Sequence, residues 1–170
     1  MGSRPLRDMT SYQVAVAAEA FAAALFAQAG FHVSVQYGAN QPGYDLIVEK
    51  RKKAHLVSVK GSQDGGWGLT QKHLKDANYP GAIDTWEARH DPNLLYCFVQ
   101  FQGKKLGEMP EMFLARSAEV AIHLRASGGH LGDTILHMEK TWKRGKRAGH
   151  TDRIPATWKF TTRRVLELVP

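Results

Sequence analysis

Residues 43 to 63 read GYDLIVEKRKKAHLVSVKGSQ, and they carry the clearest fold signal in the chain. It contains two apolar runs, Tyr44 to Val48 and His55 to Val59, separated by the polar segment Glu49 to Lys53. Apolar runs of this length around a short polar segment are typical of paired β-strands. The stretch therefore predicts a β-hairpin whose turn is the five-residue polar segment.

The open end of this hairpin carries two opposite charges. Asp45 begins the first predicted strand and Lys60 follows the second. In an antiparallel hairpin the start of one strand lies beside the end of the next, so we expect these two side chains to meet. Carboxylate oxygens bind Mg²⁺, and an adjacent lysine can orient water or stabilise charge on a phosphate. The alternative is a surface hairpin with an ordinary exposed Asp and Lys.

An acid, a short hairpin and an acid-x-Lys triplet form the motif of the PD-(D/E)xK nuclease superfamily. Gly43-Tyr44-Asp45 with Ser58-Val59-Lys60 resembles this motif, and the resemblance covers residues 19 to 76. Gln63 resembles the Lys-x-x-Gln extension of some Holliday-junction resolvases. The resemblance implies a restriction-endonuclease-like fold, a Mg²⁺ cofactor that Mn²⁺ can replace, and hydrolysis of DNA phosphodiester bonds.

One position departs from the family pattern. Ser58 stands where the family carries Asp or Glu, and a neutral hydroxyl is a poor metal ligand. Some restriction enzymes of the superfamily use Ser-x-Lys and take the missing carboxylate from the helix after the lysine strand. By that resemblance the replacement here is Asp76, with Asp64 as a closer alternative in a Gly-rich loop. We favour Asp76, because a helix holds a ligand more rigidly than such a loop.

A helix is expected over residues 11 to 29, ahead of the hairpin. Thr10 and Gln13 have the spacing of a capping box, and Gly30 is placed to end the helix. At about 100° per residue, Glu19 shares one face with four apolar or aromatic residues, namely Tyr12, Ala15, Ala22 and Phe26.

This placement predicts that the Glu19 carboxylate points towards the interior or a cleft, where it needs a partner. The alternative is that Glu19 lies at the edge of the apolar stripe and reaches solvent. Many nucleases of the superfamily have an acid in this helix. The resemblance therefore implies a catalytic set of Asp45, Lys60, Glu19, Gln63 and Ser58, and a metal-binding set of Asp45, Glu19 and Asp76.

The rest of the chain predicts one α/β domain over residues 1–170. Leu94 to Phe101 is almost continuously apolar and indicates a central strand covered on both faces. Further elements are expected as helices over 70–78, 82–89 and from Ser117, strands over 31–37, 112–115 and 134–138, and a helix or strand over 157–169. The order αβββαβ predicts a central mixed β-sheet flanked by helices.

The segment Gly61 to Gly68 is too Gly-rich to predict regular structure, and we expect it to close over a substrate. Trp67 within this segment can stack on a base or wedge into a groove. Anchoring the segment on the core is the other interpretation of this tryptophan.

Positive charge is concentrated near the C-terminal end. The chain carries a net charge of +7, and residues 140 to 153 hold six basic residues and one acidic residue, 6 − 1 = +5. Such a segment favours sequence-independent contacts with DNA phosphates, although a solvated loop without a ligand is the alternative. The nucleic-acid-binding residues predicted in this way, with duplex or branched DNA as partner, are Lys143, Arg144, Lys146, Arg147 and Trp67.

Several other classes of function are disfavoured. A lone Cys97 and scattered histidines cannot build a closed zinc site, and no serine lies in a Gly-x-Ser-x-Gly elbow. The chain has no Gly-x-x-x-x-Gly-Lys phosphate loop. Glu19 interrupts the Ala-rich run from Val14 to Ala29, which disfavours a signal peptide or a membrane span. We therefore expect a cytoplasmic protein with no membrane partner, and the sequence allows a homodimer.

Two hypotheses about function remain. In the first, the protein is a Mg²⁺-dependent endonuclease. In the second, Ser58 marks a catalytically inactive nuclease-like protein that binds DNA or takes part in an assembly. They are distinguished by whether a second carboxylate approaches Asp45 closely enough to share a metal ion.

Overall fold

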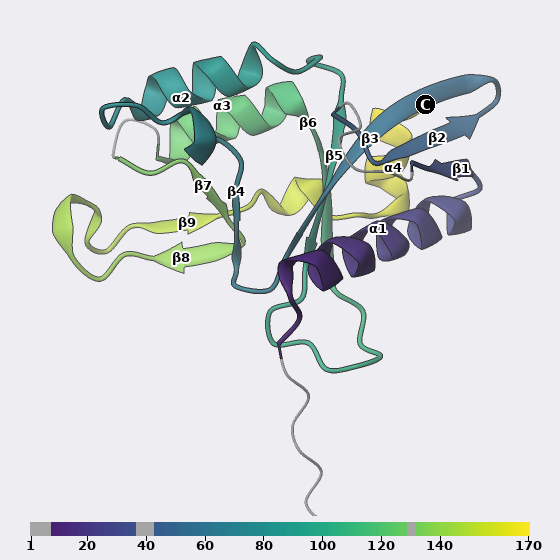
Figure 1. Ribbon diagram of the computed structural model, residues 1–170, viewed down its shortest axis with the longest axis horizontal. Coiled ribbons are helices and arrows are strands. Elements are labelled where there is room, and N and C mark those ends of the chain that lie inside the picture. Colours follow the sequence, from purple (N-terminus) through teal and green to yellow (C-terminus); the bar gives the residue numbers. More distant parts are fainter. Residues whose placement is uncertain (1–7, 37–42, 129–131) are drawn as a thin grey trace, which may run out of the picture.

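The computed structural model describes residues 8–36, 43–128 and 132–170 (Figure 1). Within these residues a central sheet has five strands in the order β1-β2-β3-β5-β6. The strands are β1 (His32–Val35), β2 (Leu46–Lys50), β3 (Lys53–Ser62), β5 (Leu95–Gln100) and β6 (Glu111–Arg116). β3 and β5 run parallel, whereas the other neighbours are antiparallel. The prediction of a single α/β domain with a mixed sheet is confirmed.

The predicted hairpin is formed by β2 and β3, but its turn is shorter than expected. Only Arg51 and Lys52 lie between the strands, with φ angles of 53° and 64°. Positive φ at both central residues is the geometry of a two-residue turn that matches the twist of the strands. The expected five-residue turn is therefore wrong, because Glu49, Lys50 and Lys53 belong to the strands.

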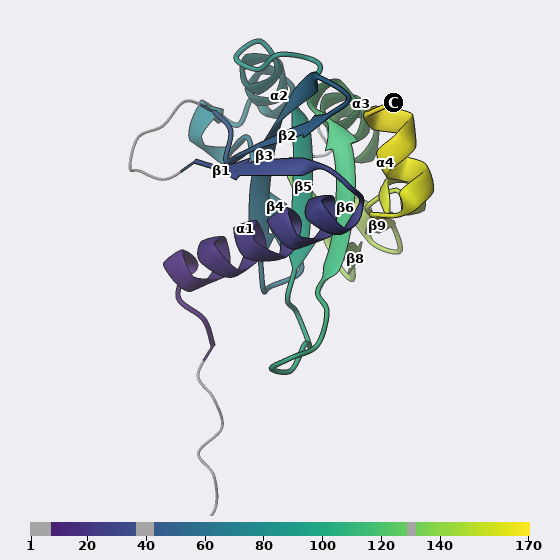
Figure 2. The ribbon, with the colours of Figure 1, turned by 90° about the vertical axis from the view of Figure 1, so that its right-hand side faces the viewer.

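The sheet carries helices on both faces (Figures 1 and 2). The residues of α1 (Ser11–Gln28) and α4 (Thr162–Leu168) share one hydrophobic core with the sheet, and those of α2 (Tyr79–Glu87) and α3 (Ser117–Ser127) share the other. The predicted capping box of α1 is present, since Thr10 and Gln13 exchange side-chain and backbone hydrogen bonds.

All six residues of β5 are buried, which confirms the expected internal strand. Leu95, Cys97 and Val99 pack on the α1 side, whereas Tyr96 and Phe98 pack on the α2 and α3 side. A strand covered on both faces needs apolar residues at every position rather than at alternate ones. The burial of both faces of β5 therefore explains the almost continuous apolar run from Leu94 to Phe101.

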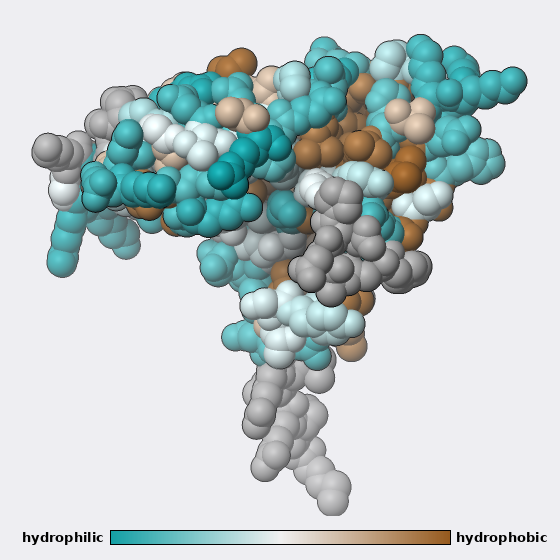
Figure 3. Space-filling model, turned by 45° about the horizontal axis from the view of Figure 1, so that its top comes forward, coloured by the Kyte–Doolittle hydropathy of each residue, from teal (hydrophilic) through white to brown (hydrophobic). Residues whose placement is uncertain are grey.

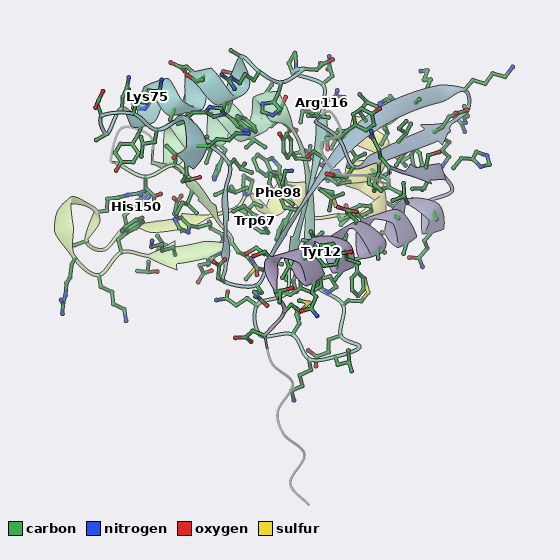
Figure 4. The ribbon with its side chains drawn as sticks, viewed as in Figure 1. Tyr12, Trp67, Lys75, Phe98, Arg116 and His150 are labelled. Atoms are coloured by element: carbon green, nitrogen blue, oxygen red, sulfur yellow. The ribbon has the colours of Figure 1, made fainter. Side chains whose placement is uncertain are left out.

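The Gly-rich segment after β3 is more regular than expected. β3 continues to Ser62, and β4 (Gly66–Gly68) pairs with β7 (Ile135–His137). Trp67 is 3% exposed, its indole N–H donates to the Lys60 carbonyl at 2.9 Å, and its ring centroid lies 5.3 Å from that of Phe98. Figure 4 shows Trp67 and Phe98 together in the interior. The indole therefore anchors the segment on the core, which is the other interpretation given above for this tryptophan.

The helix expected over residues 70–78 does not form. A single 3₁₀ turn, η1 (Gln71–His73), is followed by Asp76 and Ala77 with φ angles of 49° and 56°. α2 then begins at Tyr79, and Pro80 lies in its first turn rather than ending a helix. The fixed φ of proline suits that position, where no backbone N–H is needed.

Residues 140 to 153 form a β-ribbon instead of a loop. β8 (Glu139–Thr141) pairs antiparallel with β9 (Thr151–Arg153), and a 3₁₀ turn, η3 (Gly145–Arg147), lies between them. The strand expected over 134–138 is β7, but it is not the last strand. A short turn, η4 (Ala156–Trp158), then leads to α4.

The polar and apolar residues are separated as in a water-exposed domain. Hydrophilic residues cover most of the face shown in Figure 3, whereas the two cores hold the large apolar side chains. Among the described residues, no helix is long and apolar enough to cross a membrane.

Candidate functional site

A cavity of about 460 Å³ lies where α1, the start of β2, the end of β3 and β4 meet. Five polar residues singled out from the sequence line it, and they are Glu19, Asp45, Lys60, Gln63 and Asp64. Gly61 brings α1 and β3 together here, because a Cβ at this position would lie 2.8 Å from Val14 Cγ1 and 2.9 Å from Ala18 Cβ. The absence of a side chain at Gly61 therefore lets the helix that carries Glu19 approach the strand that carries Lys60.

Asp45 is held against β3 by the backbone. Its Oδ2 accepts the N–H of Val59 at 2.6 Å and the hydroxyl of Ser58 at 3.4 Å. The Asp45 N–H donates to the Val57 carbonyl at 2.8 Å, so hydrogen bonding between the strands continues to this residue. The carboxylate thus has a fixed orientation, and Oδ1 has no hydrogen-bond partner among the described residues.

Lys60 faces the same side of the sheet as Ser58, because side chains alternate along a strand. It is half-buried, and its ammonium forms no ion pair with any carboxylate that the structure describes. The prediction that Asp45 and Lys60 meet at one end of the sheet agrees with their shared cavity.

Glu19 has an unusual electrostatic environment. Partial burial raises the pKa of its carboxyl, the negative charge of Asp45 raises that pKa further, and the charge of Lys60 opposes both effects. Within the described ranges the Glu19 carboxylate has no hydrogen-bond or ion-pair partner. The charges of Asp45, directly before β2, and of Lys60, in β3, thus both act on the Glu19 carboxyl.

The helical face expected for Glu19 is partly wrong. Ala22 and Phe26 are buried as expected, but Tyr12 is 77% exposed and Ala15 is also exposed. The buried residues of α1 recur at every fourth position, and they are Val14, Ala18, Ala22 and Phe26. Glu19 follows Ala18 and lies at the edge of this stripe, where it opens into the cavity. The Glu19 side chain therefore faces a cleft, as predicted, although it lies at the edge of the buried stripe.

Ser58 and Gln63 contact the site in ways that differ from the predicted catalytic roles. Ser58 is 2% exposed and its hydroxyl contacts Asp45, so this buried side chain helps to orient the carboxylate. Gln63 accepts the Met9 N–H at 3.2 Å and donates to the Met9 carbonyl at 2.7 Å. These two bonds fasten the segment before α1 to the end of β3 and indicate a positioning residue.

The structure favours Asp64 over Asp76, the residue expected from the sequence to replace the missing acid. Asp76 does not line the cavity, and the helix that would have held it is absent. Figure 4 shows the neighbouring Lys75 far from the start of α1, where Tyr12 lies. Asp64 lines the cavity, and its Oδ1 accepts the Ser62 hydroxyl at 2.7 Å and the Gly66 N–H at 3.3 Å.

The structure shows a Tyr96 environment that the sequence did not indicate. Tyr96 is paired with Ser58 across β3 and β5. Burial raises the pKa of its phenol, and the Asp45 charge raises that pKa further. Only the strand register reveals this relationship, so no signal in the sequence could have found it.

The basic segment divides into exposed and buried residues. Lys143 and Arg144 are exposed on the ribbon, whereas Arg147 is 5% exposed. The Arg147 guanidinium lies 3.5 Å from Asp133 and from Asp152. The prediction that Arg147 contacts DNA is therefore wrong, because its charge is already paired inside the protein. The side chain of Lys146 is outside the described part.

No protein-family model, curated protein or solved structure matches the chain. The nuclease resemblance therefore depends on the motif residues and on their arrangement around the cavity. The described ranges contain no group of three or more His, Cys, Asp or Glu side chains close enough to share a metal ion. Glu19 nevertheless fits a cation site chemically, because a half-buried carboxylate without a partner gains from a nearby positive charge.

Proposed function

We propose that this protein is a metal-dependent endonuclease that hydrolyses DNA phosphodiester bonds in the cavity between α1 and β3. One observation carries the proposal. Asp45, Glu19 and Lys60, from three separate elements, line one cavity, and the Glu19 carboxylate there has a raised pKa and no partner in the described structure. Perturbed carboxyl groups that converge in a cleft are typical of functional sites.

Asp45 and Glu19 would hold Mg²⁺ together with water molecules, since Mg²⁺ in proteins commonly takes one or two carboxylates and keeps several waters. Asp64, which lines the same cavity, would support this site without being a third direct ligand. When bound, the ion lowers the pKa of a coordinated water and offsets negative charge on the phosphate. It would also reduce the repulsion between Asp45 and Glu19 that raises the Glu19 pKa.

The residues of this chain have distinct roles in the proposal. The bonds from Val59 and Ser58 hold the Asp45 carboxylate in one orientation. Lys60 directs an unpaired ammonium to the cavity, where it can orient a water or stabilise charge on the phosphate. Gln63 fixes the start of α1 and so supports the position of Glu19.

A second candidate function is a catalytically inactive nuclease-like protein that binds DNA or serves an assembly. Two observations favour it. Ser58 replaces the usual acid and is buried behind Asp45, and the described residues have no preassembled cluster of metal ligands. On this interpretation Lys60 is a DNA contact only.

Cleavage assays separate the two functions. Labelled duplex, branched and single-stranded DNA are incubated with the protein in Mg²⁺ or Mn²⁺. Asp45→Asn should reduce cleavage by about 10³-fold, the loss expected when several kcal/mol of metal-dependent stabilisation are removed. Asp76→Asn is the matched control and should cleave normally, because Asp76 is exposed and outside the cavity.

The outcomes exclude one another. Equal cleavage by the Asp45 and Asp76 variants would assign the activity to a contaminant and contradict the proposal. DNA binding by the wild-type protein without cleavage in either metal would support the inactive protein instead.

A further inference from the structure

The ribbon of β8 and β9 is connected to the strands beside the cavity. Gly66 and Gly68 of β4 line the cavity, and β4 pairs with β7 through Gly66 and His137. Met138 alone separates β7 from β8, and its N–H donates to the Gly65 carbonyl at 2.9 Å. The ribbon therefore starts one strand away from the candidate site, and it projects from the body of the domain in Figure 1.

Internal contacts hold the ribbon in a defined shape. The pairing of β8 and β9 continues beyond the two strands, because the Trp142 N–H donates to the His150 carbonyl and the Gly149 N–H donates to the Trp142 carbonyl. The Trp142 ring contacts the Lys140 ammonium at 3.9 Å and the Arg147 guanidinium at 4.3 Å from its centroid.

Arg147 also fastens the ribbon to the domain. Besides Asp133 and Asp152, its guanidinium donates to the Ser127 carbonyl at the end of α3 at 2.5 Å. The ribbon is thus attached to the body through a buried side chain and through β7.

The outer half of the ribbon combines positive charge with groups that can form hydrogen bonds. Residues 141 to 151 include four basic residues and no acidic residue. Arg147 is directed inward, whereas Lys143 and Arg144 are exposed, and so is His150, which Figure 4 shows on the ribbon. The exposed Thr141 and Thr151 hydroxyls lie 2.9 Å apart across the two strands.

We propose that this ribbon enters the major groove of B-form duplex DNA, so that duplex DNA is the substrate class of the neighbouring cavity. This substrate assignment depends on the proposed nuclease function. The major groove of B-DNA is about 12 Å wide and admits a two-stranded β-ribbon. A-form RNA has a deep and narrow major groove that side chains cannot read, and single strands have no such groove.

Binding measurements without divalent metal test the ribbon separately from the chemistry. A DNA duplex, an RNA duplex of the same length and a single-stranded DNA are compared by fluorescence anisotropy over a salt series. The test variant is Lys143→Gln with Arg144→Gln. The matched control is Arg51→Gln with Lys52→Gln, two exposed basic residues at the turn of the β2–β3 hairpin, the end of that hairpin opposite Asp45 and Lys60.

The wild-type protein should bind the DNA duplex about tenfold more tightly than the other two nucleic acids. The ribbon variant should lose about tenfold in affinity for the DNA duplex and lose the preference itself. Its salt dependence for that duplex should fall by up to about two counterions, one for each cation removed. The control variant should keep the preference.

Three results would overturn the inference. They are equal affinity of the wild-type protein for duplex DNA and duplex RNA, equal losses for the ribbon and control variants, and a ribbon variant with unchanged affinity. The proposed function can fail independently. A protein that prefers duplex DNA through the ribbon but cleaves no DNA with Mg²⁺ or Mn²⁺ would contradict the nuclease proposal and leave the DNA-binding surface established.

Discussion

Arg147, Asp133 and Asp152 form a buried group, which we call the Arg147 cluster. This cluster and the α1–β3 cavity both combine carboxylates with a basic residue, but their electrostatics differ. In the cluster, burial alone would raise the pKa of Asp133, yet hydrogen bonds from His137 and the Ile135 N–H, with nearby positive charge, hold that pKa below its ordinary value. In the cavity, burial and Asp45 raise the pKa of Glu19. The folded structure therefore favours the ionised form of Asp133 and disfavours that of Glu19.

The difference lies in whether the charged groups have partners. Arg147 reaches two carboxylates and a carbonyl, and only its Nε is without a partner in the described structure. Glu19 and Lys60 form no such bonds among the described residues. Removing one member of a paired buried network leaves an uncompensated buried charge and destabilises the fold. Unpaired charged groups that converge in an open cavity indicate a functional site instead.

Among the substitutions that test this comparison, we expect the largest effect on stability. Arg147→Ala leaves Asp133 and Asp152 buried without their cation, which should cost about 3 kcal/mol of unfolding free energy, or a Tm decrease of about 6–12 °C. Arg153→Ala is the control, because its ion pair with Glu139 is exposed and should contribute less than about 1 kcal/mol. Thermal unfolding followed by circular dichroism measures both. Equal Tm values for the two variants would show that the cluster is not a structural anchor.

The next largest effect is on cleavage. Substitution of Asp64 tests which acid replaces the carboxylate that the family carries at the position of Ser58. Asp64→Asn should reduce the metal-dependent rate by about 10²-fold, comparable to losing a metal-supporting group, because Asp64 lines the cavity. Asp76→Asn should leave the rate unchanged. Single-turnover cleavage with saturating enzyme measures both rates, and the reverse ranking would restore Asp76 as the ligand.

Glu19→Gln should have opposite effects on activity and stability. Because the Glu19 pKa is raised in the folded state, wild-type stability decreases as pH rises above the ordinary value of 4.5 and through the folded pKa. The variant lacks this ionisation, so it should have a higher Tm than wild type at pH 7, and the difference should shrink towards pH 4. Its cleavage rate should fall by about tenfold if the carboxylate supports the metal.

Tm measured across this pH range, with cleavage measured at pH 7, checks both effects. A variant that is less stable than wild type at pH 7 would show that the Glu19 carboxylate has a stabilising partner. The cavity would then hold paired charges, as the Arg147 cluster does, and the two regions would no longer differ in this respect.

The smallest predicted effect concerns Ser58. Its hydroxyl contacts Asp45 at 3.4 Å, a long hydrogen bond, so Ser58→Ala should cost less than about 1 kcal/mol in either stability or cleavage. Denaturant unfolding and single-turnover cleavage provide the two measurements. A loss of cleavage as large as that of Asp64→Asn would mean that Ser58 itself belongs to the catalytic set.

The elements that could be predicted from the sequence are those whose signals are local. The capping box at Thr10, the β-hairpin around residues 43 to 63 and the buried strand from Leu95 to Gln100 follow from short-range hydrogen bonding and from the spacing of apolar residues. The pairing of Asp45 with the end of β3 also follows, because antiparallel strands fix which ends are neighbours.

The orientation of the remaining polar and aromatic residues depends on long-range contacts in the folded chain. Trp67 became part of the core because β4 pairs with β7, a partner nearly seventy positions along the chain. Arg147 turned inward because Asp133, Asp152 and Ser127 offered it partners. Such long-range contacts leave no periodic pattern in the sequence, since each depends on elements that meet only in the folded chain.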